Sequence, residues 1–98
     1  MMKLKDEKVR NEKYYCVGYC EYLNKYVLVT TVTWVVWYSR YYEISEEEYL
    51  SFESDIQKLD MLAMECNNLE NLSERFLFSD KSEENTPEQN ALMKKIKA

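Results

Sequence analysis

The chain contains no histidine, and this absence excludes several kinds of chemistry before any motif is considered. It rules out His-based acid–base catalysis, Ser-His and Cys-His nucleophiles, and metal sites with histidine ligands. The single glycine, Gly18, likewise rules out a glycine-rich loop that cradles phosphate groups. We therefore expect a protein without enzymatic activity.

Cysteine is scarce as well, with only Cys16, Cys20 and Cys66. An odd number of cysteines, and no apolar segment behind the basic N-terminal residues, argues against a secreted disulfide scaffold. On one strand Cys16 and Cys20 would share a face about 13 Å apart, too far for a disulfide or a shared metal ion. No apolar run reaches the roughly 18 residues of a membrane span. We expect free thiols, no metal or other cofactor, no membrane contact and a cytoplasmic location.

Negative charge is abundant but unevenly placed in this chain of 98 residues and net charge −5. Residues 1–42 carry seven basic and four acidic side chains, whereas residues 43–84 carry three basic and thirteen acidic ones. This balance disfavours nucleic acid as a partner and favours a cationic protein. The alternative is that these carboxylates simply solvate an exposed helix face.

The first half of the chain is predicted to be mostly strand, within one domain that spans residues 1–98. Residues 1–13 are charged and predict either a short helix or a flexible arm. Residues 14–44 are rich in tyrosine and valine, which favour antiparallel strands, with Asn24 in a hairpin turn. The stretch after Asn24 is too long for one strand, so we place a break between Val36 and Arg40.

A long helix is predicted over residues 46–67. Ser45 and Glu48 have the spacing of a capping box, in which each side chain bonds the backbone N–H of the other residue. Apolar residues then recur every three or four positions and predict one buried stripe. The stripe consists of Tyr49, Phe52, Ile56, Leu59, Ala63 and Cys66.

The C-terminal part predicts a short helix over residues 86–97, with Thr86 as its cap and Pro87 at its first position. Its packing face would consist of Ala91, Leu92 and Ile96. Residues 75–78 predict either an edge strand or a helical turn. The expected fold class is α+β: a three- to four-stranded antiparallel β-meander packed against one long helix, with a short C-terminal helix.

Two groups of side chains suggest a binding surface. Nine Tyr, two Trp and three Phe are present, and ten of these fourteen lie in the β region. We expect about half of those ten to be core and others to anchor a protein interface. On a straight helix Leu50, Met61 and Met64 would lie within about 60° of one another, amid acidic residues. Such an apolar strip with an acidic rim could dock a basic surface, unless the C-terminal residues cover it.

The strand-to-helix junction over residues 40–53, RYYEISEEEYLSFE, carries a family resemblance. Together with the tyrosine-rich strands and the acidic composition, it resembles the immunity proteins of bacterial polymorphic and contact-dependent growth-inhibition toxin systems. The resemblance implies a protein that binds one cognate toxin domain, often a basic nuclease, and blocks its active site or substrate groove.

Our leading hypothesis is therefore a non-enzymatic inhibitor that binds a cationic toxin domain through the acidic helix. The predicted contact residues are Glu46, Glu47, Leu50, Glu53, Asp55, Asp60, Met61 and Glu65. Two alternatives remain open: an inhibitor from a phage or mobile element that blocks a host nucleic-acid enzyme, and a structural homodimer formed through the tyrosine- and valine-rich strands. A cleft for a small ligand is a further alternative.

Overall fold

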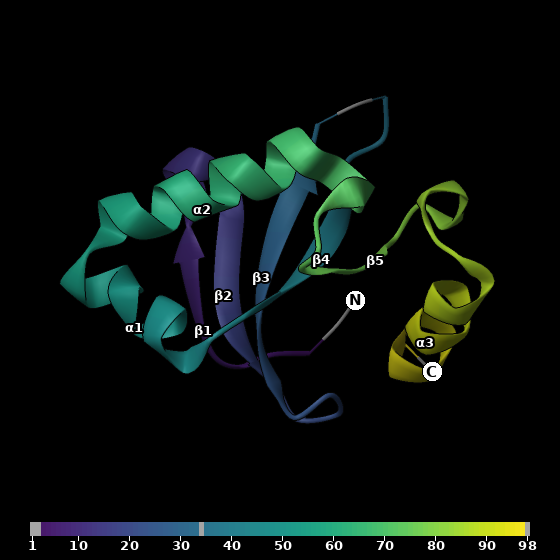
Figure 1. Cartoon of the computed structure of the whole chain (residues 1–98), viewed down its shortest axis with the longest axis horizontal. Coiled ribbons are helices and arrows are strands. Elements are labelled where there is room, and N and C mark those ends of the chain that lie inside the picture. The colour runs from purple at the N-terminus through teal and green to yellow at the C-terminus, as the bar shows by residue number, and fades with distance from the viewer. Residues whose placement is uncertain (1–2, 34, 98) are drawn as a thin grey trace.

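A computed structural model describes residues 3–33 and 35–97, and Trp34, one of the aromatic residues of the β region, lies outside the described residues. Its centre is an antiparallel sheet in which strands adjacent in sequence are also adjacent in space, in the order β1-β2-β3-β4-β5 (Figure 1). The strands are β1 (Lys5–Arg10), β2 (Tyr15–Cys20), β3 (Lys25–Val32), β4 (Tyr38–Ile44) and β5 (Phe76–Ser79).

Helices cover both faces of this sheet. Helix α1 (Glu46–Ser54) and helix α2 (Ile56–Leu69) pack on one face, with α2 running across the strands, and helix α3 (Pro87–Lys97) packs on the opposite face beside β5 (Figure 1). Short 3₁₀ turns are η1 (Asn11–Lys13), η2 (Glu70–Leu72) and η3 (Ser82–Glu84). The α+β class is confirmed, but the sheet has five strands and the predicted long helix is two helices.

The N-terminal segment forms a strand, so the expectation of a short helix or flexible arm is wrong. Residues Lys5–Arg10 pair with β2, with an irregular register between Lys5 and Lys8. Lys8 donates to Glu53 in α1 at 2.6 Å, and Arg10 pairs with Asp60 in α2 at 3.1 Å. Because the strand is charged along both faces, its sequence has no apolar alternation that would reveal it.

The break between β3 and β4 comes earlier than predicted. The strand β3 ends at Val32 and β4 begins at Tyr38, so Ser39 and Arg40 lie within β4 rather than in the turn. Val35 and Val36 are exposed in the connection although valine favours strands. Arg40, by contrast, is buried within β4, where it forms ion pairs with Glu70 and Glu84.

The predicted long helix is interrupted at Asp55. The backbone N–H of Asp55 donates to the Ser51 carbonyl at 2.8 Å, and α1 ends there. The carboxylate of Asp55 accepts from the Lys58 N–H at 3.3 Å and so caps the first turn of α2. The capping box at the start of α1 is confirmed, with Glu48 N–H to Ser45 Oγ at 3.1 Å and Ser45 N–H to Glu48 Oε1 at 2.8 Å.

The core consists of two apolar layers, one on each face of the sheet. The predicted stripe of α1 and α2 lies in the first layer, where Leu28 and Tyr42 of the sheet meet it. The second layer joins Val27, Val29 and Phe78 to α3. Leu92 and Ile96 of α3 pack there as predicted, whereas Ala91 is exposed and Met93 takes its place.

Two of the remaining C-terminal predictions can be checked directly. Residues Phe76–Ser79 form the edge strand β5, which was one of two alternatives. Thr86 and Gln89 form a second capping box, with reciprocal bonds of 3.2 and 2.8 Å. None of the helices within residues 3–33 and 35–97 combines the length and apolar character that a membrane crossing requires.

The single glycine is required by close packing rather than by backbone conformation. A Cβ at Gly18 would lie 2.8 Å from Leu4 Cβ and 3.2 Å from the Lys5 carbonyl oxygen. Only glycine lets the N-terminal segment pass this closely over β2. Leu4 thereby reaches the second apolar layer.

Candidate functional site

The strongest candidate site is a groove between α1 and α2, which exists because the two helices are separate. Its volume is about 440 Å³, and apolar atoms form most of its surface. We call it the α1–α2 groove. Its lining consists of Glu48, Ser51, Asp55, Gln57, Lys58, Leu59, Met61, Leu62 and Glu65.

The carboxylates of this groove differ in how far they are already neutralised. Glu48 forms two hydrogen bonds of 2.8 Å with the Arg75 guanidinium. Burial alone would raise the pKa of Glu48, but the bonds from Arg75 and from the Ser45 N–H outweigh it and lower that pKa. Glu65 is exposed, and among the described residues its carboxylate has no hydrogen-bond or ion-pair partner. Asp55 accepts only a backbone N–H.

The predicted contact residues divide into two groups. Asp55, Met61 and Glu65 line the α1–α2 groove, and Met61 is 70% exposed. The remaining predicted residues, Glu46, Glu47, Leu50, Glu53 and Asp60, lie outside its lining.

The predicted residues outside the groove mostly have partners of their own. Glu53 binds Lys8, and Glu46 accepts weakly from the Tyr26 hydroxyl at 3.3 Å. Glu47 lies 3.6 Å from Lys58 in an exposed ion pair, so it is close to the groove rim. Leu50 is exposed on α1, and the break at Asp55 places it on a different helix from Met61.

Asp60 is the most strongly engaged of these carboxylates. It accepts from Arg10 Nε at 3.2 Å, from another Arg10 nitrogen at 3.1 Å and from the Tyr15 hydroxyl at 2.6 Å. The hydrogen bond from Arg10 lowers the pKa of Asp60 despite partial burial. Asp60 thus joins α2 to β1 and β2.

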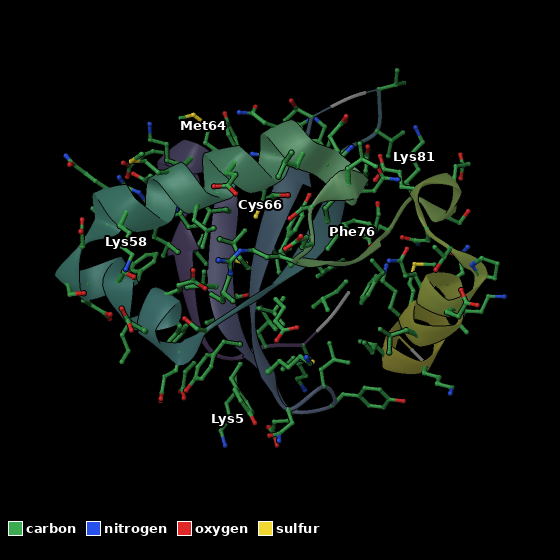
Figure 2. All side chains as sticks on the ribbon, in the orientation of Figure 1. Lys5, Lys58, Met64, Cys66, Phe76 and Lys81 are labelled. Carbon is green, nitrogen blue, oxygen red and sulfur yellow. The ribbon has the colours of Figure 1, made fainter. Side chains whose placement is uncertain are left out.

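The outer surface of α2 is apolar in places. Met64 points away from the sheet, whereas Cys66 lies between α2 and the strands (Figure 2). Neither the C-terminal residues nor α3 cover Met61 or Met64, since Phe76, Phe78 and α3 pack elsewhere. This part of the molecule therefore presents apolar side chains next to two carboxylates, Asp55 and Glu65, that form no ion pair within the described residues.

The cysteines give no sign of reactive or metal-binding chemistry. All three are free thiols. Burial, with a contribution from Glu7, raises the pKa of Cys16 to about 12, and burial raises the pKa of Cys66 to about 11. Protonated thiols are poor nucleophiles. Within residues 3–33 and 35–97, no three acidic or thiol side chains are grouped so that they could hold a metal ion.

A second groove, which the sequence did not reveal, lies on the face of the sheet that α3 only partly covers. Its volume is about 500 Å³, and Val9, Tyr14, Cys16, Val29 and Trp37 are among its lining residues. The aromatic content of residues 14–42 was its only sequence signal, and Tyr14 and Trp37 indeed stay exposed while Tyr15, Tyr41 and Tyr42 are core.

Comparison of the chain with protein family models, with curated proteins and with solved structures finds no match. What the molecule does must therefore be argued from its own surfaces.

Proposed function

We propose that this protein is a non-enzymatic inhibitor that binds a basic protein through the α1–α2 groove, as a toxin-system immunity protein would. One observation carries the proposal: Met61 and Leu62 line the groove beside the carboxylates of Asp55 and Glu65, which form no ion pair with a basic side chain of the described residues. A partner that combines cationic and apolar side chains would satisfy both features.

The mechanism follows from this arrangement. Lysine or arginine side chains of the partner would pair with Asp55 and Glu65, while an apolar side chain packs against Met61. Carboxylates that face a basic cleft accelerate association and compete with phosphate groups for the same cations. If the partner is a nuclease, the acidic rim would occupy the positions meant for substrate phosphates.

The test uses a groove variant and a control of equal charge change. Asp55→Asn retains the side-chain cap of α2, and Glu65→Lys adds a positive charge, so the double variant alters the groove with little effect on folding. The control is Glu21→Lys with Glu88→Gln, at two exposed positions outside the groove.

Wild type and both variants are immobilised and exposed to lysate of the source cells over a range of salt concentrations. We expect wild type and control to retain one basic protein that salt releases, and the groove variant to bind it roughly ten- to a hundredfold more weakly. Equal retention by all three proteins would exclude the groove as the interface. The identity of the captured protein, a toxin domain or a host nucleic-acid enzyme, separates the immunity role from inhibition by a phage or mobile element.

A further inference from the structure

Two exposed aromatic rings form a right-angled corner in the second groove. Tyr14 directly precedes β2 and Trp37 directly precedes β4, and their rings meet edge to face with centroids 6.1 Å apart at 87°. Both rings line the groove and remain 55% and 62% exposed. Because the face of an aromatic ring carries partial negative charge, two faces at a right angle attract a small cation into the corner between them.

The backbone holds Tyr14 in place at a conformational cost. Its φ of 57° lies in the left-handed region, which glycine and asparagine adopt more readily than tyrosine. Its carbonyl accepts from the Thr31 N–H at 2.9 Å, and its own N–H donates to the Asn11 carbonyl at 3.4 Å. The sheet therefore fixes the position from which the ring extends, and backbone strain of this kind is common where a ligand binds.

The chain itself supplies no cation to this corner among its described residues. Within residues 3–33 and 35–97, the lysine and arginine side chains that lie over an aromatic ring do so at Tyr38 and Tyr49. The ring faces of Tyr14 and Trp37 therefore remain available to a cation from outside.

A carboxylate without an ion-pair partner lies in the same groove. Glu7 lines the groove and accepts from the thiol of Cys16, another lining residue, at 3.5 Å. Within the described residues Glu7 forms no ion pair. Arg10 is the other charged residue of the lining, and it binds the carboxylates of Glu12 and Asp60. The charge left at the groove is negative, which favours a cationic ligand and disfavours an anionic one.

The rest of the groove suits the carbon atoms of a small organic molecule. Its volume of about 500 Å³ is within the range of roughly 300–1,000 Å³ that is typical of small-ligand sites. Val9, Cys16 and Val29 are among its lining residues, and apolar atoms form most of its surface. None of the residues of α3 lines it, so α3 leaves it open.

We propose that the second groove binds a small organic cation with a quaternary ammonium group. The alkyl groups on the nitrogen would contact the faces of Tyr14 and Trp37, and Glu7 would balance the positive charge. A primary ammonium is more strongly hydrated, so its transfer into an apolar groove costs more. The site lies on the opposite face of the sheet from the α1–α2 groove and is independent of the function proposed above.

An NMR titration of the full chain with choline chloride, at constant ionic strength and up to about 20 mM, tests the proposal. Contacts with two rings and one carboxylate predict a dissociation constant on the order of 1 mM. The chemical-shift changes should be concentrated at the backbone amides of Cys16, Val29 and Thr31. The neutral analogue of choline, in which carbon replaces the nitrogen, has the same shape and should bind about tenfold more weakly.

Three variants locate the site. Tyr14→Asn removes one ring and suits the left-handed backbone, and Trp37→Leu removes the other ring but keeps an apolar side chain. Glu7→Gln removes the charge and keeps the shape of the side chain. Each variant should weaken choline binding roughly two- to fivefold. Tyr22→Asn, at a similarly exposed tyrosine outside this groove, is the matched control and should bind choline as wild type does.

A wild-type chain that shows no shift changes at the highest choline concentration overturns the proposal. Equal binding of choline and its carbon analogue does so too, because the groove would then have no preference for charge. Undiminished binding in all three variants would place the cation elsewhere. A trimethyllysine peptide that binds more than about tenfold more tightly than choline would assign the groove to a methylated protein instead of a free molecule. Thermal unfolding shows whether each variant is folded, and Glu7→Gln, at an exposed position, keeps the test valid if a ring variant is not.

Discussion

Arg40 is a charged side chain that the fold buries almost completely, at 5% exposure. Its guanidinium donates to the Glu84 carboxylate at 2.7 and 2.9 Å and to Glu70 at 3.2 Å. A buried charge that lacks a partner is costly, so Glu84 must return to this position after β5. The η3 turn places Glu84 beside Arg40. Two further hydrogen bonds hold Glu84 there, from the Tyr38 hydroxyl to its carboxylate and from the Asn71 side chain to its backbone carbonyl.

We predict that the Arg40–Glu84 pair makes stability sensitive to acid. The hydrogen bond from Arg40 lowers the pKa of Glu84 from 4.5 to about 2. Because the folded-state pKa lies below the unfolded value, the pair stabilises the protein fully above about pH 4.5, and this contribution is lost as pH falls toward 2. Glu84→Gln should lower the free energy of unfolding at pH 7 by about 1–3 kcal/mol and flatten its decline in acid.

Urea unfolding across this pH range measures both effects. Glu83→Gln is the matched control, because Glu83 is exposed and its carboxylate accepts only from the adjacent Ser82 hydroxyl. An acid decline as steep in Glu84→Gln as in wild type would show that other carboxylates govern it.

At the scale of helices and strands, the features that could be predicted are those set by near neighbours. The capping box of Ser45 and Glu48 and that of Thr86 and Gln89 act within three residues, so the sequence shows them directly. The break at Asp55 has a local signal too, an aspartate that can cap a helix. The apolar stripe continues through both helices, so the sequence predicts one unbroken helix and does not reveal the break or the α1–α2 groove.

Strand β1 could not be predicted, because its residues show no apolar alternation and the side-chain contacts that fix it to the helices come from far away in sequence, although its strand partner β2 is close. Lys8 binds Glu53, and the Asp6 carbonyl accepts from the Tyr49 hydroxyl at 2.6 Å. The backbone of Asp6 is left-handed, with φ 52°, and Asp6 lies where the pairing with β2 is irregular, between Lys5 and Lys8. Only the folded helices supply these contacts.

We predict that Asp55 acts as the cap that separates α1 from α2. Asp55→Ala should lower the free energy of unfolding by about 1 kcal/mol, because the Lys58 N–H loses its side-chain acceptor and keeps only the Asp55 carbonyl at 3.2 Å. Asp55→Asn keeps an acceptor at the same place and should be nearly neutral. Urea unfolding of the two variants compares them directly, and equal stability of both variants would mean that the side chain does not cap the helix.

At the scale of the whole molecule, the uneven charge of the sequence is largely explained by internal pairing. The basic residues of β1 and β4 meet the acidic residues of the later segments in the pairs Lys8–Glu53, Arg10–Asp60 and Arg40–Glu84. The acidic residues 43–84 were expected to bind a cationic partner. Basic residues of the same chain neutralise part of that negative charge. Within the described residues, the carboxylates of this segment that form no ion pair are Glu46, Asp55, Glu65, Glu74 and Glu83, and of these Asp55 and Glu65 line the α1–α2 groove.

The last prediction concerns how this pairing joins the N-terminal strand to the helices. Asp60→Asn removes the charge that accepts from Arg10 and Tyr15, so β1 should open more often while the rest of the sheet stays closed. We expect amide hydrogen exchange in β1 to accelerate on the order of tenfold, with little change in β4. Asp55→Asn, which neutralises an aspartate without a partner in β1, is the control and should leave exchange in β1 unchanged. A uniform acceleration in all strands would indicate global destabilisation, whereas no acceleration in β1 would show that the ion pair does not hold this strand to α2.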